Sequence, residues 1–296
     1  MAELMNRYEL RNRYVFTGKL VMLTAFHIGG GHGALSSSDS PVVLTPEGTP
    51  FIPGSSFKGA LRSTVEKIVP GLPAEAKMFS CGLIELSNDD MKQEEEQGHI
   101  ICSTVRQAEI VQERRRRPAA AEQITKDALD GLCHTCQLFG SPFAASRVNI
   151  NDMYMSLADW GGAVQVRDGV AIDRDSERAK DRLKYDFEVV PASAEFGLTI
   201  TLENASPQDL QLLCVGLSEF MHGFGFIGGK RSRGLGACEI RGLQVSALEL
   251  VGKDIETAER YRRLRDYLLG REVAPPVAGE KFLEQHINAI FESAIL

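Results

Sequence analysis

The sequence AEFGLTITLE at residues 194–203 decides the fold together with the periodic stretch that follows it at residues 206–222. The first stretch alternates apolar and polar residues, which predicts a strand. The second predicts a helix capped by Ser206. Its apolar residues recur at helical spacing: Leu210, Leu213, Leu217 and Phe220.

The same strand and helix patterns recur on either side of this pair. Alternation predicts further strands at residues 14–27, 146–160 and about 237–250. Pro53-Gly54 precedes a helix expected from about residue 57 to 69, with Ser55 or Ser56 as its cap. The predicted core therefore runs strand, helix, strand, strand, helix, strand. This is the order of the ferredoxin-like or RRM-like α+β fold.

The composition describes an ordinary globular chain and excludes several classes of protein. It has 296 residues, 43% of them hydrophobic and 25% charged, and a net charge of -7. No apolar run is long enough to span a bilayer, and the N-terminal stretch lacks the apolar region of a signal peptide, so we expect no membrane partner and a cytoplasmic location. Because the balance is acidic, any binding of nucleic acid must rest on local basic clusters.

Residues 81–140 read as an insertion with little apolar content of its own. It holds an acidic run at 94–96, a short strand-like piece, HIICSTV, at 99–105, the run Arg114 to Arg117, and a helical stretch ending near Cys133. The four arginines suit a solvated surface and an RNA or partner contact equally well. The acidic run suits repulsion of stray nucleic acid or contact with a neighbouring subunit.

The cysteines of this insertion predict a metal site. Cys133 and Cys136 have the spacing of a metal knuckle, and Cys81 with Cys102 would complete a tetrahedral structural Zn²⁺ site. A cytoplasmic chain favours this over disulfides. A redox CxxC is the alternative, but no thioredoxin-like unit surrounds it. We expect His99 and His134 to be reserve ligands, and the two remaining cysteines, Cys214 and Cys238, to be buried.

The segment GGKRSRG at residues 228–234 is the strongest signal for nucleic acid that the residues give by themselves. Glycines let the backbone approach RNA closely, and the adjacent cations neutralise phosphates. A plain basic surface loop is the alternative, and no Walker A motif is present. The predicted RNA-binding residues here are Gly228, Gly229, Lys230, Arg231 and Arg233.

Three other segments carry candidate phosphate contacts. The start of the helix at about 57–69 offers Ser55, Ser56, Lys58 and Arg62 near unpaired backbone N–H groups, although a solvated helix face fits as well. His27 ends the first strand before Gly29 and Gly30 and can donate to a phosphate, although a packed histidine is equally consistent. The charged arm at 165–188, which contains Arg167, reads as an exposed hairpin.

Four segments together resemble the Cas7 (Csm3-like) branch of the RAMP superfamily, which supplies RNA-binding subunits to type III CRISPR effector complexes. They are FHIGGGHGALSSSDSPVV, FIPGSSFKGALRSTVE, RDGVAIDRDSERAKDRLKYDFEVVPASAEF and GFGFIGGKRSRGLGACEI. The resemblance implies an RRM-like core at 1–80 and 141–250 with a thumb hairpin at about 163–190, a zinc-binding insertion at 81–140, and a helical C-terminal extension at 251–296. These additions are similar to the III-D or III-E branches.

The resemblance also implies a function. Asp39 matches the position of the aspartate that cuts target RNA, with Mg²⁺ or another divalent cation, whereas an aspartate before Ser-Pro can by itself merely cap a turn. The implied partners are guide crRNA, complementary target RNA, and other subunits that are Cas7-like, Cas5-like, and Cas10-like or Cas11-like. The alternatives are a purely structural RNA-binding subunit and a guide-processing endoribonuclease.

Overall fold

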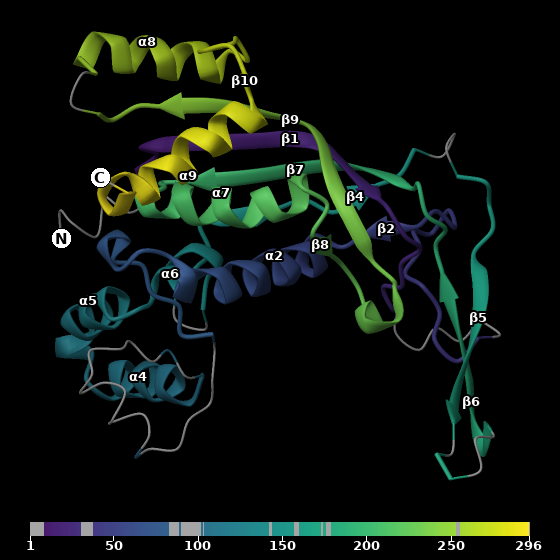
Figure 1. Ribbon diagram of the computed structural model, residues 1–296. Coiled ribbons are helices and arrows are strands. Elements are labelled where there is room, and N and C mark those ends of the chain that lie inside the picture. The colour runs from purple at the N-terminus through teal and green to yellow at the C-terminus, as the bar shows by residue number, and fades with distance from the viewer. Residues whose placement is uncertain are drawn as a thin grey trace.

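The protein is built around one antiparallel sheet, seen in the computed structural model (Figure 1), which describes residues 9–30, 38–82, 89, 102, 104–141, 144–156, 160–172, 174–175, 179–252 and 255–295. The sheet has the order β10-β9-β1-β7-β3, and β8 pairs with β9. Its strands are β1 (Asn12–Met22), β3 (Val148–Ile150), β7 (Glu195–Glu203), β8 (Gly225–Phe226), β9 (Ala237–Glu249) and β10 (Val277–Ala278).

Helices cover both faces of this sheet. On one face, α7 (Pro207–Met221) packs against α2 (Gly54–Ile68) and α9 (Gly279–Ile295), while α8 (Thr257–Leu268) lies over the other face (Figure 1). Along the chain, the central elements follow the order β1, α2, β3, β7, α7, β9. The expected mixed architecture of helices on antiparallel strands is therefore confirmed.

The core forms where the alternating strands meet the helices. In β1, Phe16 and Leu20 are fully buried on the helix side. In α7, Ser206 caps the helix as predicted: its hydroxyl accepts from the Asp209 N–H, and the Asp209 carboxylate accepts from the Ser206 N–H. Such a reciprocal capping box stabilises the helix start. The two cysteines outside the insertion are also buried, as expected: Cys214 and Cys238.

Helix α2 begins earlier than its sequence predicts. It starts at Gly54, with Pro53 as N-cap and no capping bond from a serine, so the prediction that Ser55 or Ser56 caps it is wrong. The cap comes instead from elsewhere in the chain, because the Asp152 carboxylate accepts from the Gly54 N–H at 2.8 Å. A Cβ on Gly54 would lie 2.2 Å from the Ile150 carbonyl oxygen, so only glycine allows this approach.

The stretch at 146–160, predicted as one strand, forms two short strands in different sheets. β3 joins the main sheet, whereas β4 (Met153–Tyr154) pairs with β2 (Phe51–Ile52). The chain leaves the main sheet at the residues between them, where Asp152 turns to cap α2. A requirement for a distant partner thus interrupts a locally favourable strand.

The arm is a separate two-stranded sheet of β5 (Gln165–Ile172) and β6 (Ala179–Val189), as predicted for an exposed hairpin. It projects away from the core (Figure 1). At its root it joins the end of the first strand region through a β-bridge between Phe26 and Val190. The arm is therefore anchored beside the predicted RNA-binding segments.

A helical lobe lies at the opposite side of the core. It contains α4 (Thr104–Arg116), α5 (Ala121–Asp130) and α6 (His134–Phe139), the last of which sequence analysis does not predict. The residues at 104–105, predicted as strand-like, begin α4, while the acidic run at 94–96 and the residues at 99–101 lie outside the described residues. Short 3-10 turns complete the described helices: Val69–Gly71, Ala74–Ala76, Pro118–Ala120 and Arg231–Arg233.

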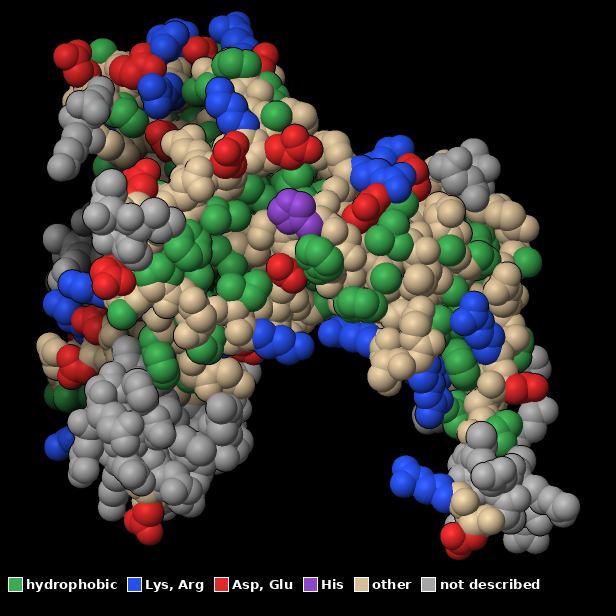
Figure 2. All heavy atoms as spheres, in the orientation of Figure 1, with side chains coloured by type: hydrophobic (Ala, Val, Ile, Leu, Met, Phe, Trp, Pro, Cys, Tyr) green, Lys and Arg blue, Asp and Glu red, His purple; other side chains and the backbone are tan. Residues whose placement is uncertain are grey.

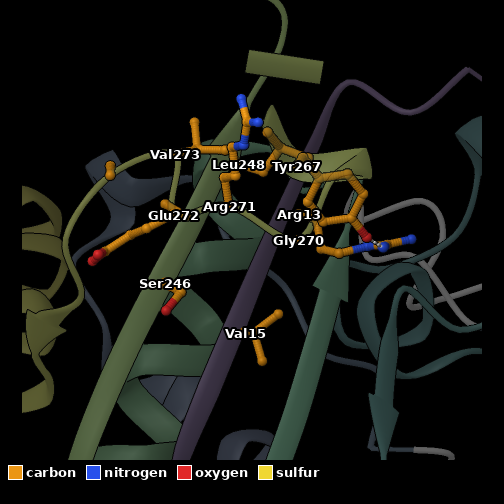
Figure 3. A pocket seen from close by; sticks show the side chains of 11 residues that line it. Arg13, Val15, Ser246, Leu248, Tyr267, Gly270, Arg271, Glu272 and Val273 are labelled. Atoms are coloured by element: carbon orange, nitrogen blue, oxygen red, sulfur yellow. Dashed lines mark hydrogen bonds between the residues drawn. The ribbon is translucent and has the colours of Figure 1, made fainter. Parts of the chain in front are cut away.

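The C-terminal extension is helical: α8 lies over the outer face of the sheet, whereas α9 packs beside α7 on the other face. Arg13 of β1 donates a hydrogen bond to the Tyr267 hydroxyl of α8 and pairs with Glu203 at 2.6 Å. A hollow of about 320 Å³ remains between the sheet and the turn after α8, with Ser246 and Val15 on its floor (Figure 3). None of the predicted site residues lines this hollow. In the described part of the chain, no helix has the length and apolar character needed to cross a bilayer.

Candidate nucleic-acid interface and metal centre

Three segments that are far apart in sequence meet at the root of the arm. They are the segment after β1 that contains His27, the loop that contains Asp39, and the glycine-rich segment at 228–234; the strand predicted to reach His27 ends at Met22. The Gly229 N–H donates to the His27 carbonyl oxygen at 2.9 Å, and Gly29 forms a β-bridge with Val42. The fold thus brings the segments with candidate functional residues to one place.

The loop containing Asp39 is hydrogen-bonded to strand β6 of the arm. The Asp39 N–H donates to Asp186 Oδ1 at 2.6 Å, and the Asp186 N–H donates back to Asp39 Oδ2 at 3.1 Å. Two residues further along, the Glu188 N–H donates to the Ser40 carbonyl at 3.0 Å, and Glu188 Oε2 accepts from the Val42 N–H at 3.0 Å. The arm therefore determines where the Asp39 carboxylate lies.

His27 is buried beneath this loop, with only 6% of its surface exposed. Its Nδ1 lies 2.7 Å from the Glu188 carbonyl oxygen, which accepts only, so Nδ1 bears a proton. Its Nε2 lies 3.2 Å from the Ser40 hydroxyl. Both ring nitrogens therefore have partners inside the protein, and the exposed backbone beyond His27 is that of Gly29 and Gly30.

The glycine-rich segment depends on one close backbone approach. Gly228 has a φ of +81°, and a Cβ there would lie 2.3 Å from the His27 carbonyl oxygen. This approach sets the start of the turn that presents Lys230, whose own φ is +59°. Arg231 and Arg233 follow on the exposed surface.

The cations of this segment lie against aromatic rings at the arm root. Lys230 Nζ lies 4.3 Å from the centre of the Phe187 ring and 5.5 Å from that of Tyr185. Arg233 donates a hydrogen bond to the Tyr185 hydroxyl, and its Cζ lies 5.9 Å from the centre of that ring. Cation–π contacts hold a side chain in place while leaving N–H donors for other partners. The positive charges are therefore ordered next to the Asp39 loop.

The residues of the arm root that organise this site are not among those predicted from the sequence. The sequence YDFE at 185–188 alternates, so its two aromatic rings face the glycine-rich segment and its two carboxylates face the Asp39 loop. The alternation is the signal that could have found them. The alternation does not indicate, however, that the glycine-rich segment and the Asp39 loop lie on either side of this strand.

Gly228 and Gly234 offer a matched test of this geometry. Both have positive φ, but a Cβ on Gly234 would meet nothing within 4 Å. We expect Gly234→Ala to cost about 1 kcal/mol of backbone strain, and Gly228→Ala to cost clearly more because the His27 carbonyl must also move. Thermal unfolding of the full chain measures both. Equal falls in Tm for the two variants would contradict the close approach.

The start of α2 is less open to a phosphate than its sequence indicates. The Gly54 N–H is bound by Asp152, and the Ser56 N–H donates to the Pro53 carbonyl at 2.9 Å. Ser55 is exposed and Lys58 is half-buried. Burial lowers the pKa of Lys58, and the charge of Arg62 lowers it further.

Arg62 faces the helical lobe instead of open solvent. Its Nε donates to Glu66 at 2.7 Å, its Nη1 to the Gly140 carbonyl at 2.9 Å, and its Nη2 to Cys136 Sγ at 3.3 Å. All three nitrogens of the guanidinium therefore have partners within the protein. Arg62 joins α2 to the cysteines of the lobe.

Other cations line a hollow beneath the core. Figure 2 shows this hollow, bounded on one side by the arm, with lysine and arginine side chains along its roof and on the inner side of the arm. Arg167 is exposed on β5, where it pairs in register with Phe187. The acidic chain thus gathers positive charge locally, as binding to a polyanion requires.

Four buried cysteines of the lobe come together as a candidate metal centre. The Sγ atoms of Cys81, Cys102, Cys133 and Cys136 all lie within 4.8 Å of one another. Cys81 and Cys136 are 3.7 Å apart at sulfur. A tetrahedral zinc with bonds of about 2.3 Å requires sulfurs about 3.8 Å apart. The four side chains therefore fit a metal such as zinc.

The four thiols of the cluster shift one another's pKa values. Hydrogen bonding to Cys102 lowers the pKa of Cys81 to about 7 and lowers that of Cys133, whereas hydrogen bonds within the cluster raise the pKa values of Cys102 and Cys136. The Cys133 N–H donates to Cys102 Sγ at 3.2 Å, and Arg62 donates to Cys136. Donors of this kind stabilise negative sulfur. Of the two reserve ligands, His134 accepts from the Phe79 N–H at 3.1 Å, and His99 lies outside the described residues.

Comparison with known proteins identifies the family. The family model of the RAMP superfamily matches residues 19–239. The chain belongs to the RAMP superfamily. This RAMP protein has its glycine-rich segment, arm and Asp39 loop inside the matched region, whereas the C-terminal extension lies outside it.

Two curated relatives of this RAMP protein are both named "CRISPR system Cms endoribonuclease Csm3". The one from Enterococcus italicus is 44% identical over 61 residues, which cover 20% of this chain and 28% of the relative. The one from Methanothermobacter thermautotrophicus is 37% identical over 59 residues, which cover 19% of this chain and 24% of the relative. The chain thus spans about a quarter of the length of each.

Proposed function

We propose that this chain is a Cas7-like backbone subunit of a type III CRISPR RNA-targeting complex. It binds guide crRNA and cleaves the complementary target RNA through Asp39. The observation that carries the proposal is the meeting of the Asp39 loop, the arm root and the cationic glycine-rich segment at one place. The names of the two curated relatives support the same activity.

The architecture in this proposal is a ferredoxin-like, RRM-like core at 1–80 and 141–250. The chain order β1, α2, β3, β7, α7, β9 and the sheet order β9-β1-β7-β3 support it. The β5–β6 arm is then the thumb that contacts the guide–target duplex. The neighbours in the complex are further Cas7-like, Cas5-like, and Cas10-like or Cas11-like subunits.

In this proposal some residues contact the RNA directly and others support them. Lys230, Arg231 and Arg233 neutralise backbone phosphates, and the exposed glycine backbones allow close approach. The remaining direct contacts are Gly29, Gly30, Ser55, Ser56, Lys58, Arg167, Gly228 and Gly229. His27 and Arg62 support the RNA-binding residues from within the protein and do not contact RNA themselves, because their nitrogens already have protein partners.

In the cleavage step the Asp39 carboxylate accepts the proton of a target 2′-hydroxyl. The 2′-oxygen attacks the adjacent phosphorus, and the 5′-oxygen of the next nucleotide leaves, so a 2′,3′-cyclic phosphate forms. A divalent cation such as Mg²⁺ bound at this carboxylate would supply neutralisation of the phosphoryl charge. The exposed carboxylate oxygens of Asp39 suit such a hard cation. Target cleavage by the complete complex with Asp39→Ala tests the proposal.

The RNA grip predicts a change in salt dependence. Replacing Lys230, Arg231 and Arg233 together with alanine removes up to three phosphate contacts. We expect weaker guide RNA binding for every sequence, and a log–log salt slope that is smaller in magnitude by about 2. Titration of the full chain with labelled guide RNA at several salt concentrations measures this.

The matched control removes the same charge elsewhere. Arg114, Arg115 and Arg116 are exposed in the last turn of α4, and their replacement with alanine removes the same net charge away from the arm root. If Lys230, Arg231 and Arg233 bind phosphates, replacing them must reduce the magnitude of the salt slope more than replacing the three arginines of α4 does. The same slope in both variants would refute it.

A non-catalytic structural subunit is the second candidate, and one observation favours it. Asp39 Oδ2 accepts from the Asp186 N–H, which is what an aspartate that only caps a turn would do. In that case the chain keeps its RNA grip and does not cut.

We also propose that the four-cysteine cluster holds a structural Zn²⁺ ion. Four cysteine thiolates form a closed site with no position for substrate, which is typical of structural zinc. The small second core of the chain supports this, because its buried residues are the four cysteines and Leu132.

A further inference from the structure

Strand β6 of the arm has two functional faces at its root. On one face, Tyr185 and Phe187 contact the cations of the glycine-rich segment. On the other face, Asp186 and Glu188 bind the loop that contains Asp39. The arm root therefore links the glycine-rich segment at 228–234 to the Asp39 loop.

The bond pair between Asp39 and Asp186 is reciprocal. Each residue donates its N–H to the carboxylate of the other, at 2.6 and 3.1 Å. The two residues are 147 positions apart, so this contact is made only in the folded chain. The bond to Oδ2 orients the Asp39 side chain, and the bond to the Asp39 N–H locates its backbone.

The side chain of Asp186 contributes one half of this bond pair. Its carboxylate accepts from the Asp39 N–H, so alanine at 186 would leave that N–H without its acceptor. In the register of the arm, Asp186 lies directly opposite Asp168, which offers a second acidic residue for comparison.

We infer that Asp186 is a positioning residue for Asp39, and that through Asp186 the arm orients the Asp39 loop. This inference rests on the proposed function. Asp186 does not touch the reacting atoms: it holds the loop that does. An arm seated on the guide–target duplex then aligns the Asp39 carboxylate, since the loop is bonded to the arm and moves with it.

Two substitutions separate positioning from charge. Asp186→Ala removes the acceptor for the Asp39 N–H, and we expect the cleavage rate of bound target to fall about 10- to 100-fold because the attack geometry is lost. Asp186→Asn keeps an oxygen at the same place, and we expect it to retain most of the rate. Both variants are measured in the complete complex under single-turnover conditions, with target affinity measured in parallel.

Asp168→Ala is the matched control. It removes one negative charge from the residue opposite Asp186 and leaves the Asp186 carboxylate in place. We expect it to leave rate and affinity unchanged. A rate for Asp186→Ala equal to that of Asp168→Ala would overturn the inference. So would an Asp186→Asn variant as slow as Asp186→Ala, since charge and not positioning would then matter.

The experiment distinguishes an error in the proposed function from an error in the positioning role of Asp186. If Asp39→Ala itself cleaves normally, the proposed function is wrong, whatever Asp186 does. If Asp39→Ala is inactive while Asp186→Ala is fully active, only the positioning role is wrong. A fall in target affinity in parallel with rate would also count against it, because a positioning residue changes the chemical step alone.

Discussion

Asp39→Ala is expected to lower target cleavage at the site facing this subunit by about 10²- to 10⁴-fold, the usual contribution of a positioned acid or base. The physical reason is that the 2′-hydroxyl loses its proton acceptor at the attack step. Asp39 is exposed at the end of a loop, so its truncation leaves the buried core intact. Guide and target affinities are therefore expected to persist. Cleavage of labelled target by the complete complex measures the effect.

Asp39→Asn distinguishes the two candidate functions. The amide keeps an oxygen that can accept from the Asp186 N–H, so the loop geometry is retained. A neutral amide is a far weaker proton acceptor than a carboxylate, so a catalytic Asp39 requires this variant to be as inactive as Asp39→Ala. Normal cleavage by Asp39→Asn would assign Asp39 to the turn and favour the structural subunit.

Removing the metal is expected to unfold the helical lobe. The cluster provides nearly all the buried residues of the second core, and metal binding in such sites supplies folding free energy of about 10 kcal/mol. We expect about one zinc per chain, and loss of helix signal with a marked fall in Tm after chelation. Elemental analysis and circular dichroism measure the two effects. Because Arg62 joins Cys136 to α2, the part of α2 around Arg62 should lose order as well.

Cysteine variants provide the control for metal removal. Cys133→Ser removes a fully buried member of the cluster, and we expect it to abolish stoichiometric zinc. Cys214→Ser places a hydroxyl at an equally buried position in α7, so it destabilises the core but leaves zinc content unchanged. Zinc absent from the native chain, with a Tm insensitive to chelator, would eliminate the site.

The main elements of the fold follow from local sequence. The alternation at 194–203 and the capped helix after Ser206 both appear where predicted, because side-chain periodicity and capping depend on neighbouring residues. The start of α2 was not predictable in this way. Its cap is Asp152, nearly a hundred residues away, and nothing near Pro53 in the sequence indicates that partner.

In the candidate site, too, the sequence indicates which residue types are present, whereas folding determines which partners they contact. The sequence selects Asp39, the cations at 230–233 and the four cysteines by chemical type, spacing and family resemblance. It does not select Asp186, because an acidic residue in a charged arm has no local signal of a role. It also leaves Arg62 as a candidate phosphate contact, whereas folding gives that guanidinium partners in the lobe.

The sequence alone therefore determined most of the main strands and helices, and which side chains can bear charge, bind metal or accept a proton. The tertiary structure decided which of those groups meet: Asp39 with Asp186, Lys230 with Phe187, Arg62 with Cys136. The reason is physical. Periodicity acts over a few residues, whereas a buried donor or charge takes whichever partner the folded chain brings within hydrogen-bonding distance.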